Sequence, residues 1–185
     1  MPIPNERRAR GMDLKKAMLM GLDECHIALR EAYSGLSDDE FWRFPLEGHN
    51  NIVTLAMHVL QQQDGFNGIL QQKRGIKARF DWHFMKHEER FELWGLPKEK
   101  LPKPGDSFPT VAEVSKIHDE LHKNIIANIE AFAEKDFISE GVGQWPRLCD
   151  PFFRAVYHAN AHIRQVWFLR GVMNVQTTWP VQHYA

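Results

Sequence analysis

Apolar residues along this chain recur at every third or fourth position, which is the period of an amphipathic α-helix. The alternation of a half-buried strand is almost absent. Four long segments carry the helical period, and they run from about Asp13 to Tyr33, from Asn50 or Asn51 to about Arg74, from Thr110 through Phe132, and from Asp150 to about Gly171. Residues 37–40 predict a short helical turn after the first segment. The pattern therefore predicts an all-α protein.

Residues that begin and end helices stand at the edges of these segments. Thr110 is followed three residues later by Glu113, the spacing of a capping box. Asp150 is an N-cap candidate, and Pro151 then occupies the first helical position, where the missing N–H costs nothing. Gly75 is expected to end the second helix. These signals place the predicted helix boundaries.

The four helices are apolar on one side, so they can bury those faces only against one another, which favours a four-helix bundle. The length of 185 residues and the hydrophobic content of 43% suit one domain over residues 1–185 with a core of about 13–173. The connection at 75–109 is longer than most loops in compact domains. Its aromatic residues favour a short extra helix packed over one end of the bundle.

Composition excludes several classes of function. The 23 Lys and Arg residues nearly balance the 24 Asp and Glu residues, so no basic surface for nucleic acid is expected. No apolar run approaches the roughly 18 residues of a membrane span, and none follows the arginines of residues 1–11 as in a signal peptide. We expect a cytoplasmic protein that binds neither membrane nor nucleic acid. Cys25 and Cys149 are expected to be reduced and structural.

Two histidines of the last segment, His158 and His162, stand four residues apart. Side chains at this spacing share one helical face with Cβ atoms about 5 to 6 Å apart. Two imidazole nitrogens on a tetrahedral metal must approach to a little over about 3 Å, so the pair can hold one ion without bending the helix. A residue at i+8 would lie about 12 Å along the axis. A third ligand must therefore come from another helix.

His58 is the predicted third ligand. It lies within residues 52–60, the most apolar surroundings of any histidine in the chain. A buried imidazole needs a hydrogen bond or a metal, because an unsatisfied polar group costs about 1 to 3 kcal/mol. A single histidine on an apolar face is more often a satisfied core residue, and it is the pair on the last helix that favours ligation. The predicted metal site is His58, His158 and His162.

Two other histidine pairs have the same spacing and show that it is weakly specific alone. His118 and His122 resemble the zincin pattern H-E-x-x-H, with Asp119 where the general base should be glutamate. Their charged neighbours favour a solvated helix edge. His83 and His87 lie in the long connection, where they can instead line a substrate entrance.

The order of these residues resembles the DinB/YfiT-like family of metalloenzymes. The resemblance rests on a histidine within the second helix, a third helix without ligands, and H-x-x-x-H in the last helix followed by Gln165 and Leu169–Arg170. It spans residues 13–173 and implies an up-and-down four-helix bundle with a long crossover between helices 2 and 3. It also implies that the three histidines hold a divalent metal, zinc or nickel, and that the protein is a homodimer. Arg164 departs from the family, which often has glycine there, and the crossover is longer.

The resemblance implies a metal-dependent hydrolase, or a transferase that uses a low-molecular-weight thiol, acting on a small-molecule substrate. Three protein nitrogens leave at least one metal position open, which is typical of catalytic sites. The alternative is a non-catalytic dimerising or ligand-binding bundle with a structural metal, which needs a closed site with four protein ligands. Three tryptophans are expected to be exposed and available to a dimer interface: Trp42, Trp94 and Trp179.

Four polar residues are candidates for supporting roles around the metal. Glu47 and His49 precede the second helix, and His26 lies on the first, so each is a candidate acid or base. Core packing or surface exposure is the alternative for each. Gln62 follows the predicted ligand of the second helix by one turn and can hydrogen-bond to water at the metal, or it is ordinary helix surface.

Overall fold

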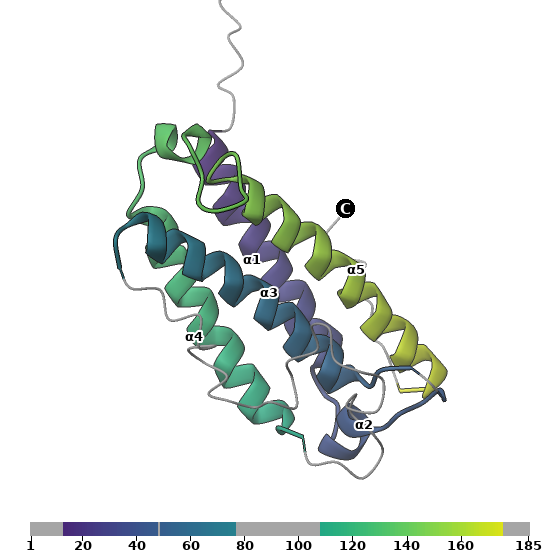
Figure 1. Cartoon of the computed structure of the whole chain (residues 1–185). Helices are drawn as coiled ribbons and strands as arrows, with labels where there is room; N and C mark the ends of the chain where they lie inside the picture. The colour runs from purple at the N-terminus through teal and green to yellow at the C-terminus, as the bar shows by residue number, and fades with distance from the viewer. Residues whose placement is uncertain (1–12, 48, 77–107, 176–185) are drawn as a thin grey trace, which may run out of the picture.

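The computed structural model describes residues 13–47, 49–76 and 108–175, and this part of the chain is helical without any β-strand (Figure 1). The all-α class is thereby confirmed for these residues. An isolated antiparallel bridge joins Glu140 and Arg147. The elements in chain order are α1 (Leu14–Tyr33), α2 (Asp38–Trp42), α3 (Ile52–Lys73), α4 (Val111–Glu130), the 3₁₀-helix η3 (Glu134–Ile138) and α5 (Asp150–Val172).

Most helix starts lie where their capping residues predicted them. The Asn51 side chain accepts a hydrogen bond from the backbone N–H of Thr54 at the start of α3. Thr110 and Glu113 form the reciprocal capping box of α4. Gly75 has φ +71° directly after α3, a conformation that favours glycine. Local side-chain chemistry thus sets these boundaries.

The start of α5 and the exposure of one tryptophan differ from prediction. Asp150 is the first residue of α5, with Cys149 at the N-cap position, because its carboxylate instead accepts hydrogen bonds from Arg147. Trp42 is half-buried and donates from Nε1 to the Pro109 carbonyl at 2.9 Å, so it is not an exposed aromatic. Trp94, Trp179 and the long connection with His83 and His87 lie outside the described residues. Cys25 is buried and unpaired, as is Cys149.

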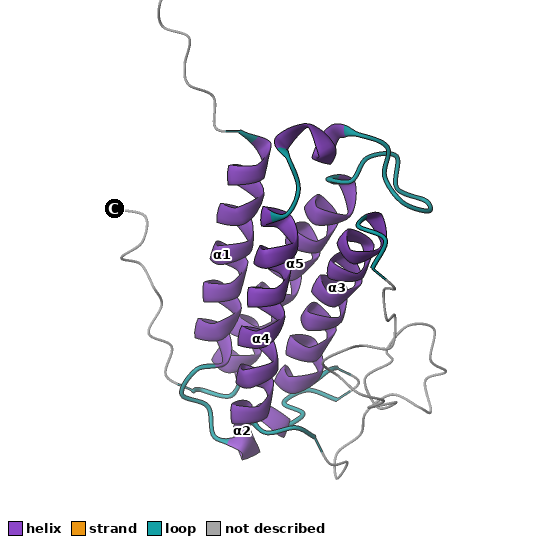
Figure 2. Ribbon diagram, turned by 90° about the vertical axis from the view of Figure 1, so that its left-hand side faces the viewer, coloured by secondary structure: helices purple, strands orange, loops and turns teal. Residues whose placement is uncertain are grey.

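The four long helices lie side by side, with α2 near one end and η3 near the other (Figure 2). The start of α1 lies near the end of α4. There, the backbone N–H groups of Leu14 and Lys15 donate to the carboxylate of Glu134, the first residue of η3, which follows α4. The ends of α3 and α4 lie together, where Arg74 donates to Asn128. Helices α3 and α4 therefore run in one direction, and α1 runs in the other.

Helix α3 lies between α4 and α5 and is buried on almost every side. The start of α3, residues 52–60, contains few polar side chains. A helix that is apolar around most of its circumference is expected to be buried in the core. Amides fill part of its contact with α4, where Asn67 donates to Asn124 at 3.0 Å and accepts from Asn128 at 2.8 Å. No described helix has an apolar stretch long enough to cross a lipid bilayer.

Helix α5 is attached to α1 at both of its ends. Near its start, the ring of Phe152 would lie only 3.2 Å from a Cβ added at Gly21, so the glycine permits close packing there. Near its end, buried Arg170 donates to the carbonyls of Ala32 at 3.0 Å and Ser34 at 2.8 Å. These carbonyls lie at the C-terminal end of α1, where the last backbone C=O groups have no N–H donor within the helix.

We expect Arg170→Met to lower the free energy of unfolding by about 2 kcal/mol, because hydrogen bonds from a charged donor contribute roughly 1.5 to 3 kcal/mol and the substitution leaves the buried carbonyl of Ala32 without its donor. Urea denaturation followed by circular dichroism measures this change. Arg164→Met is the matched control, since Arg164 is exposed on the same helix. Equal unfolding free energies for the two variants would contradict this role of Arg170.

Candidate metal centre

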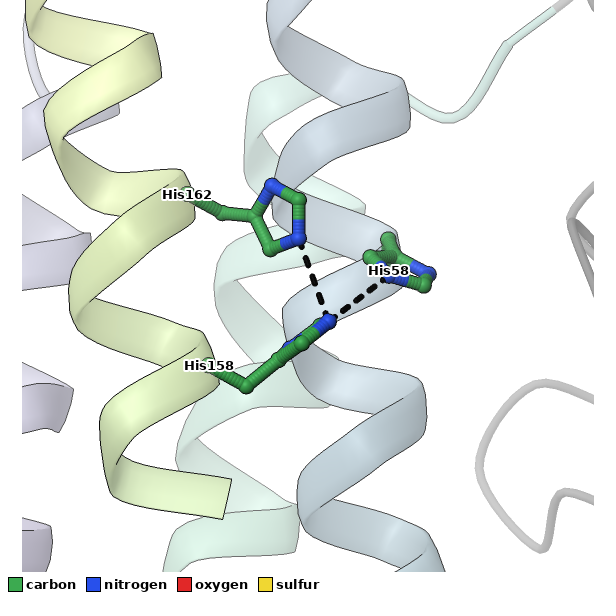
Figure 3. A group of neighbouring side chains, drawn as sticks. All are labelled: His58, His158 and His162. Carbon is green, nitrogen blue, oxygen red and sulfur yellow. Dashed lines mark hydrogen bonds between the residues drawn. The ribbon is translucent and has the colours of Figure 1, made fainter. Parts of the chain in front are cut away.

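Three histidines from two helices point toward one another (Figure 3). The Nε2 atom of His158 lies 3.0 Å from Nε2 of His58 and 3.1 Å from Nε2 of His162. Candidate ligand atoms of all three lie within 4.8 Å of one another. Two nitrogens on a tetrahedral ion at about 2.0 to 2.1 Å stand roughly 3.3 Å apart. The spacing is thus close to what one shared divalent ion needs.

Helix geometry produces this convergence. His158 and His162 are one turn apart on the face of α5 that packs against α3, so their rings lie at neighbouring heights. His58 faces them from α3 and contacts both rings edge-on, with centroids 4.7 Å and 4.8 Å away. All three side chains are half-buried. The group therefore lies at the boundary between the core and solvent, where an ion and a small molecule can reach it.

Burial keeps two of these imidazoles neutral. Desolvation, helped by the neighbouring His162, lowers the pKa of His58 to about 4, although a hydrogen bond with Gln61 opposes the shift. Desolvation likewise lowers the pKa of His158 to about 4, and His162, His58 and Arg154 add to the effect. A metal binds the neutral imidazole. Both residues are therefore in the ligand form at neutral pH.

A hydrogen bond orients the third imidazole. Nδ1 of His162 lies 2.6 Å from Oε1 of Gln165. The amide oxygen only accepts, so the proton of His162 must be on Nδ1 and the lone pair on Nε2. That lone pair faces His158 in the centre of the group. Such partners on the distal nitrogen fix the tautomer and ring orientation of metal-binding histidines.

The structure separates the other predicted site residues. His26 lies against α4, with Nε2 3.4 Å from the Asp119 carboxylate, so it is remote from the three histidines of α3 and α5. Glu47 and His49 are exposed, and Nδ1 of His49 lies 2.9 Å from the Glu47 carbonyl. Surface exposure, the alternative for Glu47 and His49, is thus observed for both, and His26 is packed against α4. Gln62 does lie nearby, in the wall of an adjacent pocket.

The prediction of a solvated edge at His118 and His122 is wrong for the first of them. His118 is fully buried, and its Nδ1 lies 3.0 Å from the Tyr33 hydroxyl. His122 is half-buried, bonds to Asp23 at 2.9 Å and stacks on His26. Burial arises because α1 covers this face of α4, which the charged sequence around the pair did not indicate. This cluster holds α1 and α4 together.

Two features of the site were not predicted from the sequence. One is a pocket of about 320 Å³ between α3, α5 and the loop before α5, one helical turn from the histidines. The other is Arg154, which lines that pocket four residues before His158. The spacing of Arg154 from the histidine pair was a signal available in the sequence. The pocket itself could not be predicted from the sequence, because its wall includes Gln144 and Trp145 from an irregular loop.

Comparison with known proteins supports the fold. The chain is similar to a solved structure described as the conserved protein of locus from Enterococcus faecalis, with a TM-score of 0.62 and 16% sequence identity. The match covers 90% of this chain and 100% of the other. At this identity the likeness shows a shared fold alone. No family model matches the chain, and the search of curated proteins found no match.

Proposed function

We propose that the protein is a DinB-like metal-dependent enzyme with His58, His158 and His162 as ligands of a divalent ion, zinc or nickel. Its reaction is hydrolysis or the transfer of a low-molecular-weight thiol. We also propose that a long crossover joins α3 and α4, which run in the same direction within the four-helix bundle, and that the protein is a cytoplasmic homodimer. The convergence of three Nε2 atoms, each within 3.1 Å of its neighbour in the group, is the observation that carries it.

The donor set fits a catalytic ion. Imidazole nitrogens suit zinc and nickel, and three protein ligands leave a position for a substrate or water. When bound, the ion supplies Lewis acidity to a substrate oxygen or sulfur. No fourth His, Cys, Asp or Glu joins the three histidines within the described residues. The group therefore matches an open site better than a closed structural one.

The chain's own residues hold and orient this centre. The hydrogen bond from His162 to Gln165 fixes one of the three rings. Gln62 lies one turn beyond His58 and presents an amide at the adjacent pocket, where it can hydrogen-bond to a substrate. Phe66 and Ile69 line the same pocket and limit water beside the substrate.

Elemental analysis of untagged protein, purified without chelator, tests the proposal directly. We expect about one zinc or nickel per chain. Loss of a thiol in the presence of electrophilic substrates identifies the transferase, and release of acid from esters and amides identifies the hydrolase. Cobalt-loaded protein whose spectrum does not respond to an added thiol would show a closed site. That result, or the absence of metal, would refute the enzymatic proposal.

A further inference from the structure

The pocket is lined by residues that lie about one helical turn from the three histidines along both α3 and α5. Gln61 and Gln62 follow His58 by three and four residues, and Arg154 precedes His158 by four, each about one 5.4 Å turn. The two helices run in opposite directions here, since Phe66 contacts Phe152 as His58 contacts His158. The glutamines on α3 and Arg154 on α5 therefore lie on the same side of the histidines, and all of them line the pocket.

One charge stands in an otherwise neutral pocket. Arg154 is exposed and has no carboxylate partner among the described residues. Its guanidinium lies 5.8 Å from the centre of the Trp145 ring. A planar guanidinium with free donors is suited to a carboxylate.

The remaining walls favour an apolar group of limited size. Phe66, Ile69 and Trp145 supply apolar surface, and the glutamines supply neutral amides. A volume of about 320 Å³ is at the lower end for small-molecule sites. Gly65 leaves part of this space open, because no atom lies within 4 Å of a Cβ added there. The pocket therefore fits a short chain or a single ring.

We propose that this pocket binds the part of the substrate remote from the reacting group, and that this part is a carboxylate carried on a short apolar segment. Arg154 binds the carboxylate, and Trp145 and Phe66 pack against the apolar segment. The inference rests on the proposed function, because the reacting end of the same molecule is held at the three histidines. It names the substrate class as small monocarboxylates.

Two thiols of matched length test the role of Arg154 in the zinc-loaded protein. Thiolate is a strong zinc ligand, so 4-mercaptobutanoate and 4-mercaptobutan-1-ol share the metal-binding end and differ at the other. We expect calorimetry to show at least about tenfold tighter binding of the carboxylate, as expected for a charge-assisted hydrogen bond. Arg154→Gln reduces this preference to less than about twofold. Arg164→Gln, which removes an exposed charge elsewhere on α5, leaves it unchanged.

A second pair of variants tests the pocket itself. Gly65→Leu fills the open space and suits a helix better than glycine, so the protein is expected to fold and to keep its zinc. We expect it to weaken binding of 4-mercaptobutanoate at least about tenfold. Gly171→Leu is the matched control, because Gly171 is also helical and open but lies at the far end of α5. Its affinity should equal that of the wild type.

The two proposals fail in different ways. Wild-type protein that binds no zinc would refute the proposed function and this inference with it. Zinc-loaded protein that binds both thiols equally would overturn the inference and leave the metal site intact. The inference is also overturned if Arg154→Gln and Arg164→Gln reduce the preference for 4-mercaptobutanoate equally, since the preference would then depend on the net charge of the protein.

Discussion

Replacing His158 with alanine is expected to reduce the metal content from about one ion per chain to near zero. His158 is the central residue of the group, because its Nε2 is the neighbour of both other Nε2 atoms. Loss of a group that only orients a ligand costs about 10- to 100-fold in affinity, so loss of the ligand itself should exceed 100-fold. Elemental analysis and competition with a chromophoric chelator measure both quantities.

The matched control is His122→Ala. It removes a histidine from the other i,i+4 pair that the structure describes, which packs between α1 and α4 and is not expected to bind metal. This variant should keep its metal and its affinity. The wild type and the control should also lose thermal stability when a chelator is added, because a bound ligand stabilises the folded state. Full metal content in His158→Ala would refute the ligand assignment.

Metal-free protein is expected to lose stability steeply as the pH falls from about 6.5 to about 4. Burial lowers the pKa of His26 to about 4 and that of fully buried His118 well below its usual value. The pKa values of His58 and His158 are lowered to about 4 for the same reason. Each folded-state pKa lies below the unfolded value of about 6.5, so the unfolded chain binds more protons in this window. Each such group contributes up to about 1.4 kcal/mol of loss per pH unit.

Urea denaturation at pH 7.5, 6.5, 5.5 and 4.5 with chelator present measures this dependence. The slope between pH 6.5 and 5.5 is diagnostic, because most carboxylates titrate at lower pH. His118→Gln removes one of the buried imidazoles and should flatten the slope. His49→Gln, at an exposed position, should leave it unchanged. A free energy of unfolding that is constant over this range would contradict the assigned burial of these histidines.

Much of the helical framework was predictable because it depends on local chemistry. Thr110 and Glu113 define the start of α4 through their own hydrogen bonds, and Gly75 follows α3 in a conformation that few other residues adopt. The first residue of α5 was less predictable, because Asp150 bonds to Arg147 rather than capping the helix. The helix η3 was not predicted, since its five residues contain no repeated apolar period.

The candidate site was predictable as far as single helices determine it. The spacing of His158 and His162 places both on one face, and the apolar neighbours of His58 place it close to the core. Which faces meet depends on packing between helices that are distant in sequence. For that reason His118, among charged neighbours, proved fully buried beneath α1, and His26 joined it rather than the metal centre.

The attachment of α5 to α1 also affects the candidate metal site, to which α1 contributes none of the three histidines. Two of the three nitrogens are on α5, and the axial position of that helix is set by Phe152 against Gly21 and by Arg170 on the last turn of α1. The third nitrogen, on α3, has no part in those anchors. A side chain added at Gly21 would require Phe152 to shift by a few tenths of an ångström, so a helix that contributes no candidate ligand constrains where the two nitrogens of α5 lie relative to that of α3.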